Sequence, residues 1–214
     1  MKIAILCNTA PLPSFPLTDI VWARVSRPEE LALHRDADLY IDLDFVAEEE
    51  RIALLEQLLP SPVLVHAVVP TLKEIGQPFI RINAWPGFLE RSVHELVAPD
   101  EETAMRIGKL YERLEKRYRL VPDTPGMISG RIIAAVVNEA YHTLQEEVST
   151  KEEIDTAMKL GTNYPYGPFE WSERIGLQQI DALLTELSKT ADRYTPAAAL
   201  KKAAKQAAKR GGMN

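Results

Sequence analysis

The histidines of this chain, together with one neighbouring glutamate, are the side chains best suited to proton transfer near neutral pH. His66 lies near the C-terminal end of a predicted central strand, which is where open α/β sheets bind their ligands. Its imidazole is therefore a candidate general base, with a purely structural histidine as the alternative. His94 directly precedes Glu95, so on a strand the two side chains point to opposite faces, which weakens them as a catalytic pair.

Metal and thiol chemistry are not indicated. No pair of histidines has the spacing of a metal site, so we expect no bound metal. His34 and His142 fall on predicted helices, where we expect them to face solvent or a packed interface. Cys7 is the single cysteine, which rules out an internal disulfide and fits a reducing compartment. A nucleophilic role for this thiol is the less favoured interpretation.

A turn rich in glycine and proline separates two predicted helices. Residues 161–176, "GTNYPYGPFEWSERIG", contain three glycines and two prolines. Gly161 stands where a C′ glycine would end the preceding helix, and Pro168 stands where an N1 proline would begin the next one. The first interpretation is that these residues only end one helix and begin the next, and a functional site is the alternative.

The charge balance argues against a general nucleic-acid binder, because contact with phosphates needs a basic face. The chain carries 25 basic and 31 acidic residues, for a net charge of −6. The exception is the C-terminal segment, where Lys201, Lys202, Lys205 and Lys209 lie among alanines and predict a helix with one cationic side. A solvated terminal helix and contact with an anion, such as a nucleotide phosphate, both explain this pattern.

The hydrophobic pattern indicates a protein that folds in water. No run of about eighteen apolar residues is present, and the apolar run "KIAIL" is too short and too early for a signal peptide. This run is typical of a strand. We therefore expect a cytoplasmic protein with no membrane partner and no nucleic-acid partner.

Strand-like and helix-like segments alternate in the first half of the chain, which predicts a largely parallel sheet. The later half is helical throughout, beginning with an apolar segment over 125–147 and a capping box at Ser149 or Thr150. The sequence predicts an α/β domain over 1–122, of a nucleotide-binding type, and an all-helical domain over 123–214. The predicted strands are 2–6, 19–25, 38–45, 63–69, 78–84 and 92–98, and the predicted helices between and after them are 47–59 and 100–118, the latter with Asp100 as N-cap.

The helical half carries a family resemblance over residues 124–177, "TPGMISGRIIAAVVNEAYHTLQEEVSTKEEIDTAMKLGTNYPYGPFEWSERIGL". The segment resembles the C-terminal domain of the 3-hydroxyacyl-CoA dehydrogenases, in which PGF-x-x-NR is followed by G-x-N-x-P-x-GP-F-E. The resemblance implies an all-helical domain like that of 6-phosphogluconate dehydrogenase, which dimerises and walls an acyl-CoA cleft. The glycine–proline turn then fixes the angle of a helix at one of these interfaces. The positions that match the second motif are Gly161, Asn163, Pro165, Gly167, Pro168 and Phe169.

The first half resembles the NAD-binding domain of the same family, with departures that bear on the cofactor. In that domain the first strand is followed by G-x-G-x-x-G and by a helix whose N-terminus holds the pyrophosphate. This chain has "CNTAPLPSFP" instead, which offers no glycine, contains three prolines without N–H donors, and leaves no room for a full helix. Val25 and Ser26 stand where an acidic residue would hold the ribose. We therefore expect a shortened Rossmann-like fold without a usual NAD site, and a loop-only nucleotide site is the alternative.

The catalytic dyad of the family can be followed through the motif HFFNP-x-x-x-x-x-x-E. Laid on "NAWPGFLERSVHE", the motif puts Glu95 at the glutamate and Asn83 at the histidine, and an amide cannot act as a general base. Thr71 is the one hydroxyl near the family's serine-rich substrate stretch, and Gly130 replaces a substrate-contacting asparagine. Asp42 keeps a carboxylate where the family has a glutamate near the nicotinamide ribose.

Three functions remain open on these grounds. The first is a divergent homologue without NAD-dependent activity that keeps an acyl-CoA cleft. The second is an active NAD-dependent 3-hydroxyacyl-CoA dehydrogenase of fatty-acid metabolism in which His66 or Glu95 serves as base. The third is a dimerising protein-interaction module whose cleft is closed by side chains. In each case we expect a homodimer formed through the helical half, because residues 127–144 are more apolar than one small domain needs.

Overall fold

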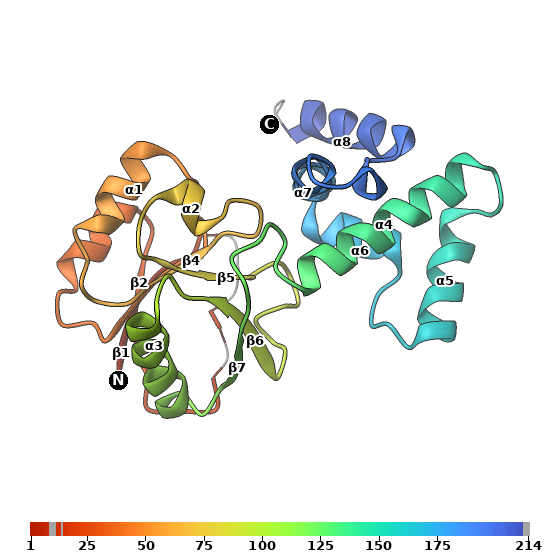
Figure 1. Cartoon of the computed structure of the whole chain (residues 1–214). Coiled ribbons are helices and arrows are strands. Elements are labelled where there is room, and N and C mark those ends of the chain that lie inside the picture. Colours follow the sequence, from red (N-terminus) through yellow and green to blue (C-terminus); the bar gives the residue numbers. More distant parts are fainter. Residues whose placement is uncertain (9–11, 14, 212–214) are drawn as a thin grey trace. The chain divides into compact units, whose positions relative to one another are not determined.

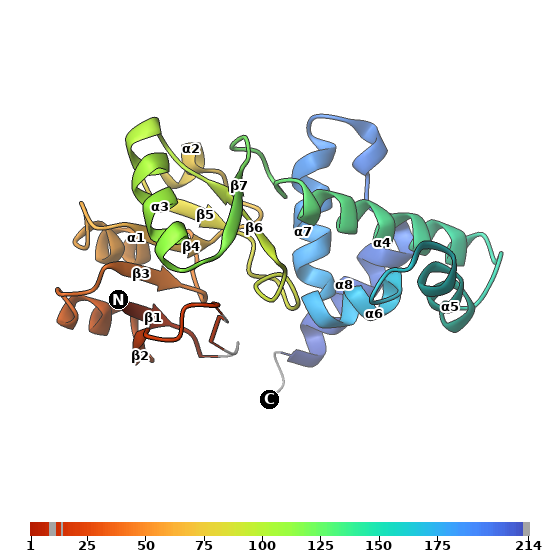
Figure 2. The same ribbon diagram turned by 90° about the horizontal axis from the view of Figure 1, so that it is seen from below.

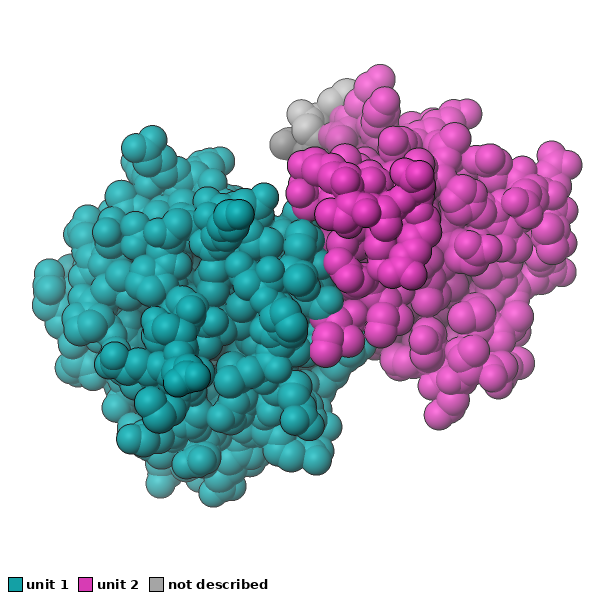
Figure 3. Space-filling model, in the orientation of Figure 1, with its two compact units in different colours: residues 1–127 teal, residues 128–214 magenta. Residues whose placement is uncertain are grey.

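The structure, a computed structural model, describes residues 1–8, 12–13 and 15–211. The chain divides into two compact units, Met1–Met127 and Ile128–Asn214, which Figure 3 colours separately. Each unit is described by itself below.

The first unit is built on a seven-stranded sheet in the order β2-β1-β3-β4-β5-β6-β7. The first five strands are parallel, β6 runs antiparallel to β5, and β7 runs parallel to β6. This arrangement confirms the predicted α/β fold with a mostly parallel sheet. The strands are β1 (Lys2–Leu6), β2 (Val21–Val25), β3 (Leu39–Asp42), β4 (Val63–His66), β5 (Ile80–Ile82), β6 (Val93–Val97) and β7 (Arg117–Leu120).

Helices cover both faces of this sheet. The side chains of β1 point alternately to one face and to the other. Ala4 and Leu6 point to the face covered by α1 (Glu49–Glu56), α2 (Leu72–Ile75) and the short helix η1 (Pro28–Leu33). Ile3 and Ile5 point to the other face, which α3 (Glu101–Arg113) covers. Figure 1 shows α1 and α2 on one side of the strands and α3 on the opposite side.

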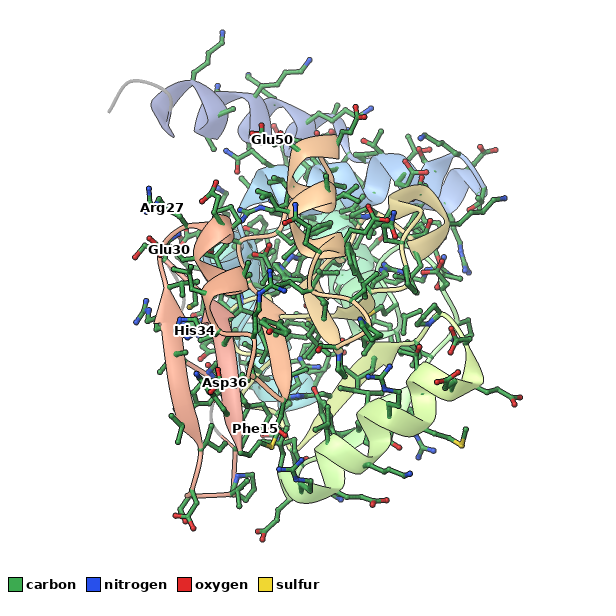
Figure 4. The ribbon with its side chains drawn as sticks, turned by 90° about the vertical axis from the view of Figure 1, so that its left-hand side faces the viewer. Phe15, Arg27, Glu30, His34, Asp36 and Glu50 are labelled. Carbon is green, nitrogen blue, oxygen red and sulfur yellow. The ribbon has the colours of Figure 1, made fainter. Side chains whose placement is uncertain are left out.

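The connection from β1 to β2 covers part of the sheet that a crossover helix covers in a usual βαβ unit. Its described residues form no helix, as its proline content predicts. Phe15 stacks on Trp22 with ring centroids 6.0 Å apart and meets Tyr111 of α3 edge-on at 6.4 Å. Figure 4 shows Phe15 beside α3. Phe15 therefore covers apolar side chains on the face of the sheet that α3 also covers.

One predicted helix is too long. The expected helix over 100–118 begins as predicted, because the side chain of Asp100 accepts a hydrogen bond from the Thr103 N–H. It ends at Arg113, because Glu115 takes a positive φ of 54° and turns the chain back. The next residues then pair with β6 as β7. The helical pattern of the sequence continues through this turn, so the strand is decided by tertiary pairing.

The second unit is all-helical, as predicted, and α4 packs against α6, α7 and α8 (Figures 1 and 2). Within it, Asn138 of α4 is buried and holds the segment before α8: it donates to the Thr195 carbonyl and accepts from the Ala197 N–H. The elements are α4 (Ser129–Gln145), α5 (Lys151–Thr162), α6 (Pro168–Ile175), α7 (Leu177–Ser188), η2 (Asp192–Tyr194) and α8 (Ala198–Gly211).

The glycine–proline turn between α5 and α6 docks one helix on the other. The buried carboxylate of Asp155 accepts hydrogen bonds from the N–H groups of Phe169 and Glu170 at 2.8 and 3.2 Å, in the first turn of α6. Gly167 is required here because a Cβ atom would overlap that carboxylate. Pro168 opens α6 as predicted. The prediction for Gly161 is wrong: α5 continues to Thr162, and Asn163, at a φ of 55°, is the left-handed cap.

Candidate functional site

The carboxyl ends of β1, β3, β4 and β5 meet at one edge of the sheet, which is where open α/β folds bind ligands. His66 ends β4, Asp42 ends β3, and Asn83 directly follows β5. The structure thus brings three of the predicted site residues to the same edge.

His66 is a neutral imidazole that orders the chain after β5. Its Nδ1 atom accepts a hydrogen bond of 3.0 Å from the Ala84 N–H. Burial lowers the pKa of His66 to about 4, and a hydrogen bond to the backbone of Ile82 offsets only part of this shift. At neutral pH the ring is therefore uncharged and weakly basic, which suits a structural role better than proton abstraction.

Asn83 directly follows β5, and Glu95 lies within β6, the antiparallel neighbour of β5. The two strands pair through Arg81↔Val97 and Ile82↔Leu96, so Asn83 and Glu95 each come one residue beyond the Ile82↔Leu96 pair. Asn83 is 4% exposed, and its Oδ1 atom accepts a hydrogen bond of 3.0 Å from the Trp85 N–H. The amide is thereby engaged in shaping the turn after β5.

Asp42 is buried below the edge of the sheet. Its Oδ1 atom accepts from the Asp44 N–H at 3.0 Å, and its Oδ2 atom lies 3.6 Å from Nη1 of Arg51. Burial raises the pKa of Asp42 to about 6, although the charge of Arg51 acts in the opposite direction. With no exposed surface, this carboxylate offers nothing to a ribose in the present conformation.

Thr71 and Gly130, the two predicted substrate-contacting positions, lie at the starts of helices α2 and α4. Thr71 is the N-cap of α2: its Oγ1 atom accepts from the Glu74 N–H at 3.3 Å and donates to the Glu74 carboxylate at 2.8 Å. Gly130 is buried in the first turn of α4, in the second unit. The hydroxyl of Thr71 is thus used in a capping box.

A buried arginine, Arg81, links β5 to the segments that follow β4 and β7. No sequence motif pointed to this residue. Arg81 of β5 has no exposed surface, and its guanidinium donates to the carbonyls of Ala67 and Val68 at 2.9 and 3.1 Å. Its Nη1 atom also lies 2.5 Å from Oδ1 of Asp123. The signal in the sequence is a single arginine inside the apolar strand "FIRIN", since a buried charge requires a partner.

His94 is structural. Its Nε2 atom lies 2.8 Å from the Leu89 carbonyl, which can only accept, so Nδ1 accepts from the Tyr111 hydroxyl at 3.1 Å. Burial lowers the pKa of His94 to about 4. The ring is neutral and enclosed, which agrees with the interpretation that it forms no pair with Glu95.

The end of β1 does not fit a dinucleotide pyrophosphate. The Asn8 N–H, which follows β1, donates to the Asp44 carboxylate at 2.7 Å. The Cys7 carbonyl accepts from Nε and Nη2 of Arg24 at 2.9 and 2.6 Å. A phosphate at this N–H would meet a carboxylate, and the described residues supply no helix N-terminus after β1. Thr9–Pro11 and Ser14 of the predicted non-binding turn lie outside the described residues.

Among the described residues, no group of three or more histidine, cysteine, aspartate or glutamate side chains is placed to hold a metal ion. Within the same part of the chain, no helix has the length and apolar character needed to cross a membrane.

Sequence comparisons connect both halves of the chain with one family. The model of the 3-hydroxyacyl-CoA dehydrogenase C-terminal domain matches residues 126–212. The probable 3-hydroxybutyryl-CoA dehydrogenase of Deinococcus radiodurans is 36% identical over 197 residues, which cover 91% of this chain and 69% of that protein. The 3-hydroxyadipyl-CoA dehydrogenase of Escherichia coli is 36% identical over 132 residues, covering 61% of this chain and 28% of that protein. The chain thus spans only part of the length of these relatives.

Solved structures share the fold. The (S)-3-hydroxybutyryl-CoA dehydrogenase of Ralstonia eutropha superposes with a TM-score of 0.71 at 22% identity, over 85% of this chain and 69% of that one. The 3-hydroxybutyryl-CoA dehydrogenase of Escherichia coli gives a TM-score of 0.59 at 30% identity, over 69% of this chain and 32% of that one.

Proposed function

The chain belongs to the 3-hydroxyacyl-CoA dehydrogenase family, and we propose that it is a divergent member that binds an acyl-CoA-type ligand without oxidising it with NAD. Acyl-CoA is the ligand class because the relatives are named as dehydrogenases of CoA thioesters. The family relation concerns descent and fold, whereas the loss of activity is argued from the residues of the site.

The observation that carries the proposal is the buried amide of Asn83 directly after β5. In the family that this chain resembles, a histidine stands at the position of Asn83, and its imidazole takes the proton of the substrate hydroxyl. An amide does not titrate near neutral pH, and the Oδ1 atom of Asn83 already accepts from the Trp85 N–H. Glu95 therefore has no imidazole to orient at this position, and Asn83 cannot accept the proton of a 3-hydroxy group.

The end of β1 supports the same conclusion for the cofactor. NAD would act as hydride acceptor, and its pyrophosphate needs N–H donors after the first strand. The Asn8 N–H is bonded to the Asp44 carboxylate, and Phe15 of the connection packs against Trp22 of β2 and Tyr111 of α3. The proposal is accordingly that this chain holds no NAD.

Two titrations and one assay test the proposal. NADH fluorescence reports cofactor binding, calorimetry with acetoacetyl-CoA reports binding of the thioester, and NADH absorbance with 3-hydroxybutyryl-CoA reports turnover. We expect heat from acetoacetyl-CoA alone. Binding of neither ligand would favour an interaction module, and robust turnover would establish an active dehydrogenase.

An active enzyme with a modified site is the second candidate, favoured by the place of His66 beside the segment that carries Asn83. In that case His66 would be the base, and its activity would depend on a group with a pKa of about 4. A His66→Gln variant separates the two: it should abolish turnover if the imidazole is the base, and there is no turnover to lose under our proposal.

We also propose that the helical unit forms a homodimer. Ile132 on α4 is 50% exposed and Leu160 on α5 is 82% exposed, so large apolar side chains remain on the surface of this unit. Light scattering at micromolar concentration should give twice the mass of the 24.0 kDa chain. A monomer under these conditions would contradict this part of the proposal.

A further inference from the structure

The sheet of the first unit has one topological switch point, between β1 and β3. The chain leaves β1 to form β2 on one side, whereas β3 lies on the other side, giving the order β2-β1-β3. In open α/β sheets the crevice at the carboxyl ends of two such strands is the usual ligand position. In this chain it is bounded by Asn8 after β1 and by Asp44 after β3.

A side chain of the protein spans this crevice. The Asp44 carboxylate accepts the Asn8 N–H at 2.7 Å, which is the short distance of a charge-assisted bond. The Asn8 side chain in turn donates to the Ser26 carbonyl, after β2, at 3.1 Å. The ends of three neighbouring strands are therefore linked through these two residues.

Two hydrogen bonds fix the backbone of Asp44 and thereby position its carboxylate. The Asp44 N–H donates to Oδ1 of Asp42 at 3.0 Å, and the Asp44 carbonyl accepts from Nη2 of Arg51 at 3.2 Å. Arg24 binds the carbonyl of Cys7 on the β2 side. Two arginines and two aspartates thus surround the crevice, and removing one carboxylate would leave an excess of positive charge.

We propose that the Asp44 carboxylate is an internal ligand of this crevice, occupying the N–H donor that a phosphate-class anion takes in sheets of this topology and thereby excluding such anions. The crevice offers an anion the backbone N–H of Asn8, and the guanidinium of Arg51 donates to the carbonyl of the neighbouring Asp44. The protein supplies the anion itself. This inference deepens the proposed absence of NAD, which rests on the same Asn8–Asp44 bond, and it does not depend on whether the chain binds acyl-CoA.

Anion rescue of an Asp44→Ala variant tests the proposal. The variant loses the bond to Asn8, so we expect its Tm to fall by roughly 3 to 6 °C. Millimolar pyrophosphate should restore a large part of that loss, because a ligand that binds only the folded state stabilises it. Sodium chloride of equal ionic strength should not. The wild-type protein should respond equally to both salts.

Two further variants make the result specific. Asp36→Ala removes a surface carboxylate that pairs with Lys2 at the other end of β1, and its Tm should show no pyrophosphate-specific rise. Asp44→Asn keeps an acceptor for Asn8 and removes the charge, so it should fold and bind pyrophosphate weakly by phosphorus NMR line broadening. Pyrophosphate binding by the wild type would overturn the proposal, as would its absence in every folded Asp44 variant.

Discussion

The Nη1 atom of Arg81 lies 2.5 Å from Oδ1 of Asp123, and this ion pair ties the central strand β5 to the segment that follows β7. Asp123 also accepts the N–H groups of Leu72 and Lys73 at the start of α2. Three separate parts of the first unit therefore depend on one carboxylate.

Asp123→Asn should destabilise the protein by about 3 to 5 kcal/mol, because it leaves the charge of Arg81 buried without a counter-charge. Denaturant unfolding of the first unit measures this loss. The matched control is Asp38→Asn, which breaks a pair with Arg113 whose side chains are 34% and 53% exposed and should cost at most about 1 kcal/mol. Equal effects of the two changes would contradict a structural role for the buried pair.

Oxidation of 3-hydroxybutyryl-CoA should be undetectable, and Asn83→His should not restore it. Loss of a general base costs about 10² to 10⁴ in rate, whereas lack of a bound hydride acceptor removes the reaction altogether. NADH absorbance with wild type and variant at equal concentration measures both. Turnover in Asn83→His alone would show that the cofactor does bind and that our interpretation of the β1 end is wrong.

Stability should fall as the pH falls from about 6.5 towards 4. The pKa values of His66 and His94 are lowered from 6.5 to about 4, so the unfolded chain takes up protons first and each histidine favours unfolding by up to about 1.4 kcal/mol per pH unit in this window. Asp42 acts oppositely, because its raised pKa of about 6 makes the folded state bind the proton first between 3.8 and 6.

The opposing signs give a direct check. Asp42→Asn removes the contribution that gains stability on acidification, so its urea unfolding midpoint should fall more steeply from pH 6 to 4 than that of wild type. His94→Gln should make the same profile shallower. A wild-type midpoint that rises over this range would exclude neutral buried histidines.

Gly167→Ala should destabilise the helical unit by about 1 to 3 kcal/mol, because the new Cβ atom would overlap the Asp155 carboxylate that caps α6. Gly161→Ala is the control on the neighbouring helix, where a Cβ atom meets nothing within 4 Å. It should stabilise by roughly 0.5 to 1 kcal/mol, through helix propensity. Circular dichroism during urea unfolding distinguishes the two.

The sequence by itself determined the class of the fold and the ends of several elements. Strand alternation with helices predicted the parallel sheet, and short-range chemistry placed Asp100 and Pro168 at helix starts, where the structure has them. It also placed a capping box at Ser149 or Thr150, and the structure has Thr150 as the cap. Motif spacing also singled out Asn83 and Glu95, which lie directly after β5 and within the neighbouring strand β6. These features depend on residues close in the chain or on a fixed spacing.

Only the tertiary structure decided the rest. Three features join residues between 24 and 42 positions apart: the pairing that makes Arg117–Leu120 a strand, the ion pair of Arg81 with Asp123, and the closure of the crevice by Asp44. Local propensity carries no information about such partners, because a buried charge or a free N–H specifies only that a partner is needed. Which residue supplies it depends on the order of the strands in the sheet, and that order is fixed by the packing of the whole unit.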